Sequence, residues 1–251
     1  MIENTTVFAA TGAILAAMAI GFLLWTRRLS DACRYYGYAV VVACGAMSGA
    51  YLLMAAELLT VTTSGRTESV ARFIGYSIAW AAVCYVLEVT TDADRRYTLA
   101  LLGTILTCLW ATMASWVLSG IAGTVVSVAI FAALLGMIYV LVGPLAREAT
   151  AVSGERTLLY GKLKNLSLLV FIGLIITGML SEQNLNFTDA FVGQTIATYL
   201  DLVWLAGFGA ILLRSEAALE DAAVSTIDRS HATTESVDGS GAGVSGVTTA
   251  D

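Results

Sequence analysis

The chain has 251 residues, of which 58% are hydrophobic and 13% are charged, and its formal net charge is −6. Its mean hydropathy of +0.80 excludes an ordinary water-soluble domain. The apolar residues come in separate blocks along the chain, so the composition predicts a membrane protein and not one large soluble core.

Seven apolar blocks follow one another along the chain. Each is close to the roughly 20 residues that cross a hydrocarbon core of ~30 Å. Such spans are helical, because every backbone amide must find its partner within its own segment. The single proline, Pro144, falls at the end of the fifth block, so no kinked span is expected. The sequence predicts an all-α bundle of seven transmembrane helices over about residues 6–26, 37–60, 71–90, 98–118, 121–143, 164–181 and 190–213.

Basic residues gather on one side of the predicted bundle, and the positive-inside rule places that side in the cytoplasm. The other side holds only Arg66 and, just inside the third helix, Arg72. The amino terminus is therefore expected outside and the carboxy terminus inside. No cleaved signal is expected, because the leading residues MIENTT carry no positive charge. The basic residues on the cytoplasmic side are Arg27, Arg28, Arg34, Arg95, Arg96, Arg147, Arg156, Lys162, Lys164 and Arg214.

The end of the chain differs in composition from the rest. Residues 215–251 are rich in Ser, Thr, Gly, Ala and acids, which predicts a disordered cytoplasmic tail after a membrane domain of residues 1–214. The four cysteines form no CxxC pair and the only histidine, His231, lies in this tail, so neither a disulfide nor a metal site is expected. The acidic pI of about 4.8 suggests a salt-adapted organism, such as a halophilic archaeon.

Four charged residues fall within or at the edges of the predicted spans, where a charge costs about 2.5–3.5 kcal/mol. Glu57 and Glu88 lie near helix ends and can reach an interface. Asp201 lies about a dozen residues into the last helix, and Arg72 opens the third. We expect Arg72 and Asp201 to form an intramembrane charge pair, either as a structural link or as part of a functional site.

The seven spans, Arg72 at the start of the third helix and Asp201 in the seventh together resemble the microbial rhodopsins, particularly the archaeal bacteriorhodopsin-like branch. In that family the last helix contains Asp-x-x-x-Lys-x-x-Phe-Gly. In the segment DLVWLAGFG, Asp201, Phe208 and Gly209 match this pattern, but Leu205 stands at the position of the lysine that binds retinal. An imine needs a primary amine, so the resemblance implies that this chain has no covalent retinal.

The resemblance also implies that proton pumping is lost. In the segment RFIGYSIAWA, Gly75 replaces the proton acceptor, and the proton-donor position falls on Val86. A pump needs an acceptor, a donor and a switchable base, and none of the three is retained. The positions that correspond to a vestigial retinal pocket are Tyr76, Ala79, Phe171, Leu174, Gly178, Asp201 and Trp204.

These departures predict an opsin-like protein of the cell membrane that acts as a regulatory or interaction component and not as an enzyme. The expected partners are membrane lipids, further copies of the chain and another membrane protein, with a link to isoprenoid or carotenoid metabolism and none to nucleic acid. The alternative is a non-covalent binder of an apolar ligand such as retinal, a carotenoid or a lipid. Gly75 and Gly178 do not distinguish an interaction protein from a ligand-binding protein, because small residues either open a cavity or let helices approach closely.

Overall fold

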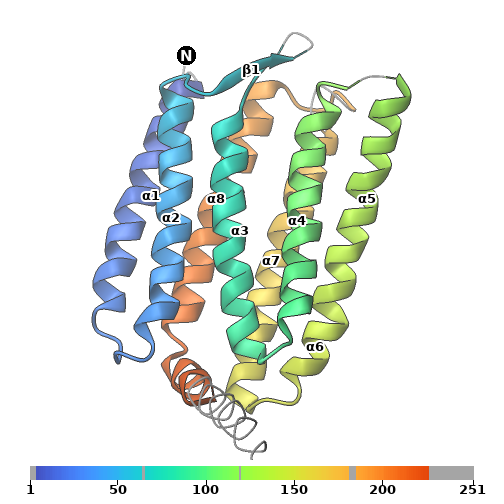
Figure 1. Ribbon diagram of the computed structural model, residues 1–251. Coiled ribbons are helices and arrows are strands. Elements are labelled where there is room, and N and C mark those ends of the chain that lie inside the picture. The colour runs from blue at the N-terminus through green and yellow to red at the C-terminus, as the bar shows by residue number, and fades with distance from the viewer. Residues whose placement is uncertain (1–3, 64–65, 119, 181–184, 226–251) are drawn as a thin grey trace, which may run out of the picture.

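The computed structural model describes residues 4–63, 66–118, 120–180 and 185–225. Within these residues, seven helices are long and apolar enough to cross a membrane, which confirms the all-α seven-helix prediction (Figure 1). A short helix α6 (Pro144–Ala149) begins with the only proline of the chain, at a position where a missing amide costs nothing. The long helices are α1 (Asn4–Thr26), α2 (Arg34–Ala55), α3 (Val70–Thr91), α4 (Arg95–Ser115), α5 (Gly120–Val142), α7 (Gly154–Leu180) and α8 (Ala190–Leu213).

The long helices alternate in direction between two ends of the bundle (Figure 1). We call the end where α1 begins the amino-terminal end and the end where α8 finishes the tail end. Aspartates cap two of the helices: Asp94 accepts a hydrogen bond from the amide of Arg96, and Asp189 accepts one from the amide of Val192. Such caps satisfy amides that have no partner within the helix.

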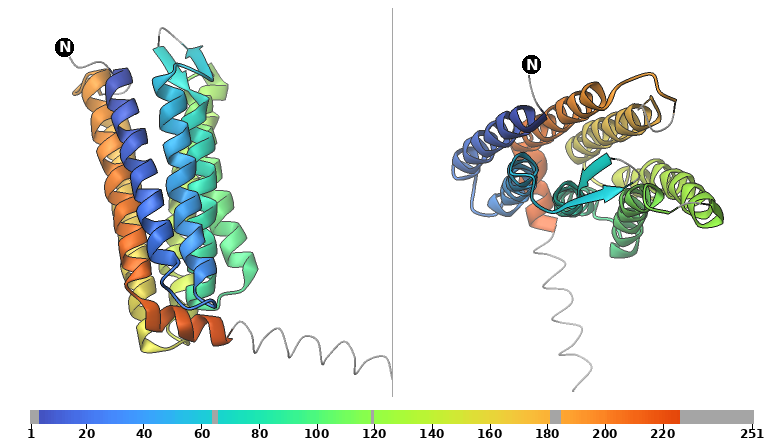
Figure 2. Two further views of the ribbon diagram at one scale, coloured as in Figure 1. Left: turned by 90° about the vertical axis from the view of Figure 1, so that its left-hand side faces the viewer. Right: turned by 90° about the horizontal axis from the view of Figure 1, so that it is seen from above.

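Helices α2, α3 and α8 contribute most of the buried residues, and α8 packs against α1, α2 and α7 (Figure 2). Gly209 makes this close approach possible. A Cβ atom at Gly209 would lie 2.5 Å from Cζ of Phe22 and 2.8 Å from Cγ1 of Val40. The glycine of the Phe208-Gly209 pair therefore serves helix packing against α1 and α2.

The connection between α2 and α3 differs from the prediction. Helix α2 ends at Ala55 and not at residue 60, and Glu57 lies beyond it with a φ of 55°. The chain then forms an antiparallel hairpin of β1 (Thr60–Thr63) and β2 (Arg66–Ser69), with Val61 opposite Glu68. The run TVTT is β-branched throughout, which favours a strand over the end of a helix.

Helix α7 begins at Gly154, ten residues before the predicted start of the sixth span at residue 164. Its first turns are polar, so a hydropathy window leaves them out, although Glu155 in the first turn suits a helix amino terminus. Lys162 and Lys164 consequently lie inside α7 and not at its start.

The prediction of disorder from residue 215 onward is wrong for residues 216–225, which are helical. The segment EAALEDAAVS is rich in strong helix formers. It is ordered because its small apolar side chains Ala218, Leu219, Ala222 and Ala223 are buried against the bundle. The remainder of the predicted tail, residues 226–251, lies outside the described residues.

Candidate functional site

Asp201 of α8 lies in the middle of the bundle with none of its surface exposed. The hydroxyl of Tyr51 donates to its Oδ2 at 2.5 Å, and the hydroxyl of Tyr76 lies 2.7 Å from its Oδ1. Arg72 brings Nη2 to 3.3 Å from Oδ2. A buried carboxylate is costly unless it is paired and hydrogen-bonded, and this one receives donors from both α2 and α3.

Arg72 extends the same network toward the amino-terminal end of α8. Its Nη1 donates to Oε1 of Gln194 at 2.6 Å, and its Nε lies 3.3 Å from the hydroxyl of Tyr76. The hydroxyl of Tyr51 also lies 3.4 Å from Oγ1 of Thr198. We call Tyr51, Arg72, Tyr76, Gln194, Thr198 and Asp201 the polar cluster.

The sequence analysis placed Arg72 opposite Asp201, and the structure brings the two side chains into direct contact. It missed Gln194 and Thr198, although their spacing of seven and three residues before Asp201 puts all three on one face of a helix. Tyr51 is not among the predicted site residues, although the hydroxyl of this fully buried residue binds the carboxylate.

An aromatic core lies one turn further along α8. The rings of Trp80 and Trp204 are 4.4 Å apart between centroids at an interplanar angle of 31°, and Phe171 meets Trp80 edge-on at 5.6 Å. These three residues, the aromatic core, are each at most 3% exposed. Leu205, adjacent to Trp204, is also fully buried. The side chains of the protein itself therefore pack the middle of the bundle.

Neither lysine of the chain is directed toward Leu205. Lys162 is exposed on α7. The Nζ of Lys164 lies 5.7 Å from the ring centroid of Tyr160, which is one turn nearer the tail end. Leu205, one turn after Asp201, thus has no primary amine, and the amines of the two lysines lie elsewhere.

The two glycines that the sequence left ambiguous have different surroundings. A Cβ atom at Gly75 would lie 2.7 Å from Cβ of Ala50 and 3.1 Å from Sδ of Met47, so this glycine lets α3 approach α2 closely. The side chain of an acid has no room there. Gly178 is exposed and a Cβ atom on it would meet nothing within 4 Å, so it does not join the aromatic core.

The remaining predicted site residues are Ala79, Val86 and Leu174. Ala79 is fully buried next to Trp80, Val86 is 1% exposed and lies nearer the tail end of α3, and Leu174 is half-buried on α7. All four cysteines are buried and free. The described ranges of the chain contain no group of three or more His, Cys, Asp or Glu side chains that could hold a metal ion.

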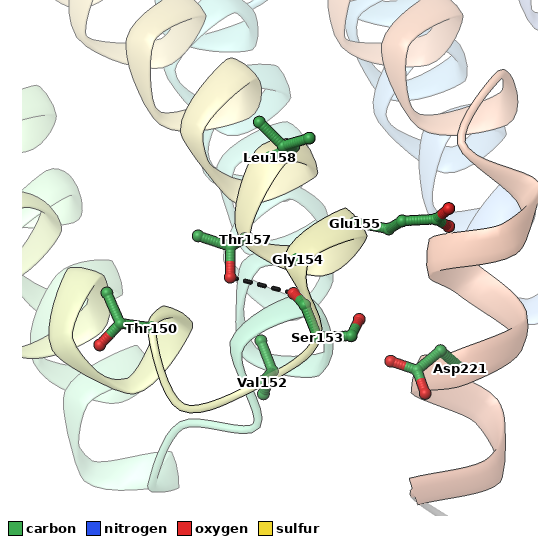
Figure 3. A pocket seen from close by; sticks show the side chains of 8 residues that line it. All are labelled: Thr150, Val152, Ser153, Gly154, Glu155, Thr157, Leu158 and Asp221. Atoms are coloured by element: carbon green, nitrogen blue, oxygen red, sulfur yellow. Dashed lines mark hydrogen bonds between the residues drawn. The ribbon is translucent and has the colours of Figure 1, made fainter.

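The two cavities that stand out lie on the surface. One, of about 760 Å³, is at the tail end and is lined by residues 150, 152–155, 157 and 158 together with Asp221 (Figure 3). The other, of about 250 Å³, is a groove between α2 and α3 with Gly45, Gly49 and Gly75 in its lining. Neither is lined by Leu205 or the aromatic core.

The polar cluster predicts strong coupling between Arg72 and Asp201. Replacing either residue with alanine leaves a buried charge without its main partner, which typically costs about 3–5 kcal/mol of unfolding free energy. Replacing both should cost much less than the sum, because both desolvation penalties disappear together. Unfolding of the two single variants and the double variant in detergent measures the coupling. If the two losses simply add, the pair is not coupled.

The contact at Gly75 predicts a second effect on stability. Gly75→Ala should destabilise the bundle by about 1–3 kcal/mol, because the new methyl group overlaps Ala50. Gly103→Ala in α4 is the matched control, since a Cβ atom there meets nothing within 4 Å and alanine favours a helix. The unfolding temperature should fall in Gly75→Ala and rise in Gly103→Ala. Equal stabilisation of both would show that α2 and α3 are not in close contact at Gly75.

Comparison with known proteins relates this geometry to one family. The sequence model described as "Bacteriorhodopsin-like protein" matches residues 3–219. Sensory rhodopsin-2 of Natronomonas pharaonis is 29% identical over 231 residues, which cover 87% of this chain and 92% of that protein.

Solved structures show the same fold. The thermophilic rhodopsin from Rubrobacter xylanophilus matches with a TM-score of 0.82 at 21% identity, covering 88% of this chain and 100% of that chain. The light-driven proton pump of Coccomyxa subellipsoidea matches with a TM-score of 0.77 at 18% identity, covering 85% and 97%. Because the family match spans the whole bundle, this chain belongs to the bacteriorhodopsin-like family of microbial rhodopsins and is a multi-pass protein of the cell membrane.

Proposed function

We propose that this chain is an opsin-like membrane protein that forms no retinal Schiff base, drives no light-dependent transport and acts as an interaction or regulatory component of the membrane. The observation that carries the proposal is Leu205, a buried hydrocarbon side chain one turn after Asp201. Proteins of this family normally bind retinal, and the covalent link requires a lysine amine. At this position the chain offers none.

The packing around Leu205 supports the proposal independently of the missing amine. The indoles of Trp80 and Trp204 stack on each other and Phe171 closes one edge of the pair. Protein interiors are close-packed, so a polyene chain at this level would have to displace at least one of these large rings. The residues present do not fit the covalent pigment.

The loss of pumping rests on two further positions. Gly75 offers no proton acceptor and Val86 no donor. Asp201 is already held by two tyrosine hydroxyls and an arginine, which stabilise the carboxylate in place. A directional proton path needs groups whose pKa values are separated and switchable, and these residues do not supply one. The same lack of a reactive constellation supports a role outside enzyme catalysis.

The surface of the bundle supports an interaction role, because it remains available to partners when the fold is kept without its pigment. The groove between α2 and α3 is lined by Gly45, Ala46, Gly49 and Ala50, and small residues let a neighbouring helix approach closely within a membrane. We propose that the partners are further copies of this chain or another membrane protein, including an enzyme of isoprenoid or carotenoid metabolism. Co-purification from native membranes, followed by mass spectrometry, tests this. Recovery of the chain alone and as a monomer would contradict it.

A second candidate function is non-covalent binding of an apolar ligand that carries one oxygen. Nε1 of Trp80 and Nε1 of Trp204 are buried and have no hydrogen-bond partner among the residues that the structure describes. An indole N–H can only donate, so a carbonyl or hydroxyl oxygen would suit it. Retinal, a hydroxylated carotenoid or a lipid has such a group. This candidate requires the aromatic core to open.

We also propose that the tail end faces the cytoplasm. Arg27 and Arg28 lie in the connection between α1 and α2 at this end, and Arg95 and Arg96 lie in the first turn of α4. The positive-inside rule places this end inside. Arg156 adds little to this bias, because it is buried and paired. Protease added to intact cells should leave an epitope tag at the carboxy terminus uncut and remove it after lysis. Cleavage in intact cells would reverse the orientation.

The absence of a Schiff base can be tested directly. After addition of all-trans retinal and borohydride reduction, peptide mapping should find no retinylated lysine in the native chain. Leu205→Lys should be labelled poorly, and Leu205→Lys combined with Trp204→Ala should be labelled better, because the smaller side chain makes room for the polyene. A stoichiometric adduct on Lys162 or Lys164 of the native chain, with absorption in the visible range, would overturn the proposal.

A further inference from the structure

The helical residues 216–225, which we call the strap, lie across the tail end of the bundle below α8 (Figures 1 and 2). One face of the strap is buried against the bundle through Ala218, Leu219, Ala222 and Ala223. Their spacing forms a single apolar stripe along a helix. Glu216, Glu220 and Asp221 are exposed. Three of the four buried residues are alanines, so the strap buries little apolar surface.

Arg156, near the start of α7, binds the carboxyl end of α3. Its side chain is 3% exposed, and its Nη2 forms an ion pair with Oδ1 of Asp92 at 2.8 Å. Nη2 also donates to the carbonyl of Val89 at 2.7 Å, and Nε to that of Thr90 at 3.0 Å. The last carbonyls of a helix have no partner within the helix, so this guanidinium caps α3.

The same guanidinium holds the strap. Its Nη1 donates to Oγ of Ser225 at 3.1 Å and lies 3.9 Å from Oδ2 of Asp221. Oγ of Ser225 lies 3.4 Å from Oδ1 of Asp92, which closes the group. We call Asp92, Arg156, Asp221 and Ser225 the clasp. It joins α3, α7 and the strap, which are far apart in the sequence.

The two sides of the clasp differ in strength. The contacts with α3 are short and shielded, and they keep Arg156 paired whether or not the strap is present. The pair with Asp221 is long, and that side chain is 48% exposed, so solvent weakens it. Detaching the strap therefore leaves no buried charge without a partner. A bound element with little apolar burial, one weak ion pair and two hydrogen bonds through the single side chain of Ser225 belongs to the least stable part of a fold.

We propose that the strap is a detachable cover over the tail end of the bundle, and that the clasp sets how often it opens while the seven helices remain folded. Glu216 and Glu220 of the strap lie near Cys33, in the connection between α1 and α2. Ala218, Leu219 and Ala223 of the strap belong to the same hydrophobic core as Cys33. Burial raises the pKa of the Cys33 thiol, a hydrogen bond with Ser30 lowers it in part, and the nearby Glu220 and Glu216 raise it. The cavity lined by Asp221 lies between the strap and the start of α7 (Figure 3). Opening would expose this surface and free Nη1 of Arg156 for an acidic group. The inference does not depend on what, if anything, the aromatic core binds.

Amide hydrogen exchange in detergent or nanodiscs tests the strap directly. The amides of residues 216–225 should exchange faster than those of the buried part of α3, because the strap opens without global unfolding. Asp221→Asn should raise exchange in the strap about two- to fivefold, which is the effect of losing one partly exposed ion pair. Glu220→Gln is the matched control, since it removes the same charge from the same turn but does not contact Arg156. It should leave the exchange rate unchanged.

Cys33 provides a second measurement with a native probe. Its modification by a maleimide, followed by peptide mass spectrometry, should rise by the same factor in Asp221→Asn as the exchange of the strap. Only this variant is compared with the native chain, because Glu220→Gln would also alter the pKa of the thiol. Arg156 itself is not substituted, because its loss would uncap α3. The inference is overturned if the strap exchanges only with global unfolding, or if Glu220→Gln and Asp221→Asn have equal effects.

Discussion

The buried carboxylate of Asp201 is the constraint on which the centre of this bundle depends. A charge with no exposed surface has to be satisfied by the protein, and here Tyr51, Tyr76 and Arg72 supply the donors from two other helices. Those contacts fix the orientation of α8 about its own axis. They turn Trp204 and Leu205 inward one turn later, and Phe208 and Gly209 follow on the same face at the contact with α1 and α2.

With α8 held in this way, the bundle fills its own middle. The indoles of Trp80 and Trp204, 4.4 Å apart between centroids, and Phe171 at their edge supply buried aromatic surface at this level. Gly75 also contributes to close packing, because it lets α3 lie against α2 at a place where an acidic side chain would need space. We propose that the family scaffold persists here through packing, and that the positions expected to carry photochemistry take part in that packing.

Sequence reasoning works best where the physics is strongest and local. The seven spans follow from hydropathy, and the meeting of Arg72 and Asp201 follows from the cost of leaving two charges unpaired in a membrane. Sequence reasoning fails where contacts between distant parts of the chain determine the local structure. The β-branched run Thr60–Thr63 favours a strand, and the alanines of the strap favour a helix. Both were missed, because the predictions followed the hydropathy of the longer apolar block and the polar composition of the whole tail.

The aromatic core could not be predicted in the same way. Trp80, in α3, and Trp204, in α8, are far apart in the sequence, and only the folded bundle shows that their ring centroids lie 4.4 Å apart. The same holds for Gly75, whose close approach to Ala50 cannot be distinguished from an open cavity without the neighbouring helix. The clasp is a further case, because the sequence shows Arg156 only as one of the basic residues on the cytoplasmic side, and its burial depends on contacts with α3 and the strap.

We propose that the aromatic core occupies the middle of the bundle in place of a pigment. Titration of the purified protein with all-trans retinal, followed through tryptophan fluorescence and near-ultraviolet circular dichroism, tests it most directly. Stacked indoles 4.4 Å apart should give a coupled dichroic signal that Trp204→Phe abolishes. We expect retinal to leave that signal unchanged and to cause no saturable quenching of fluorescence. Saturable quenching at one retinal per chain, together with loss of the coupled signal, would contradict the account.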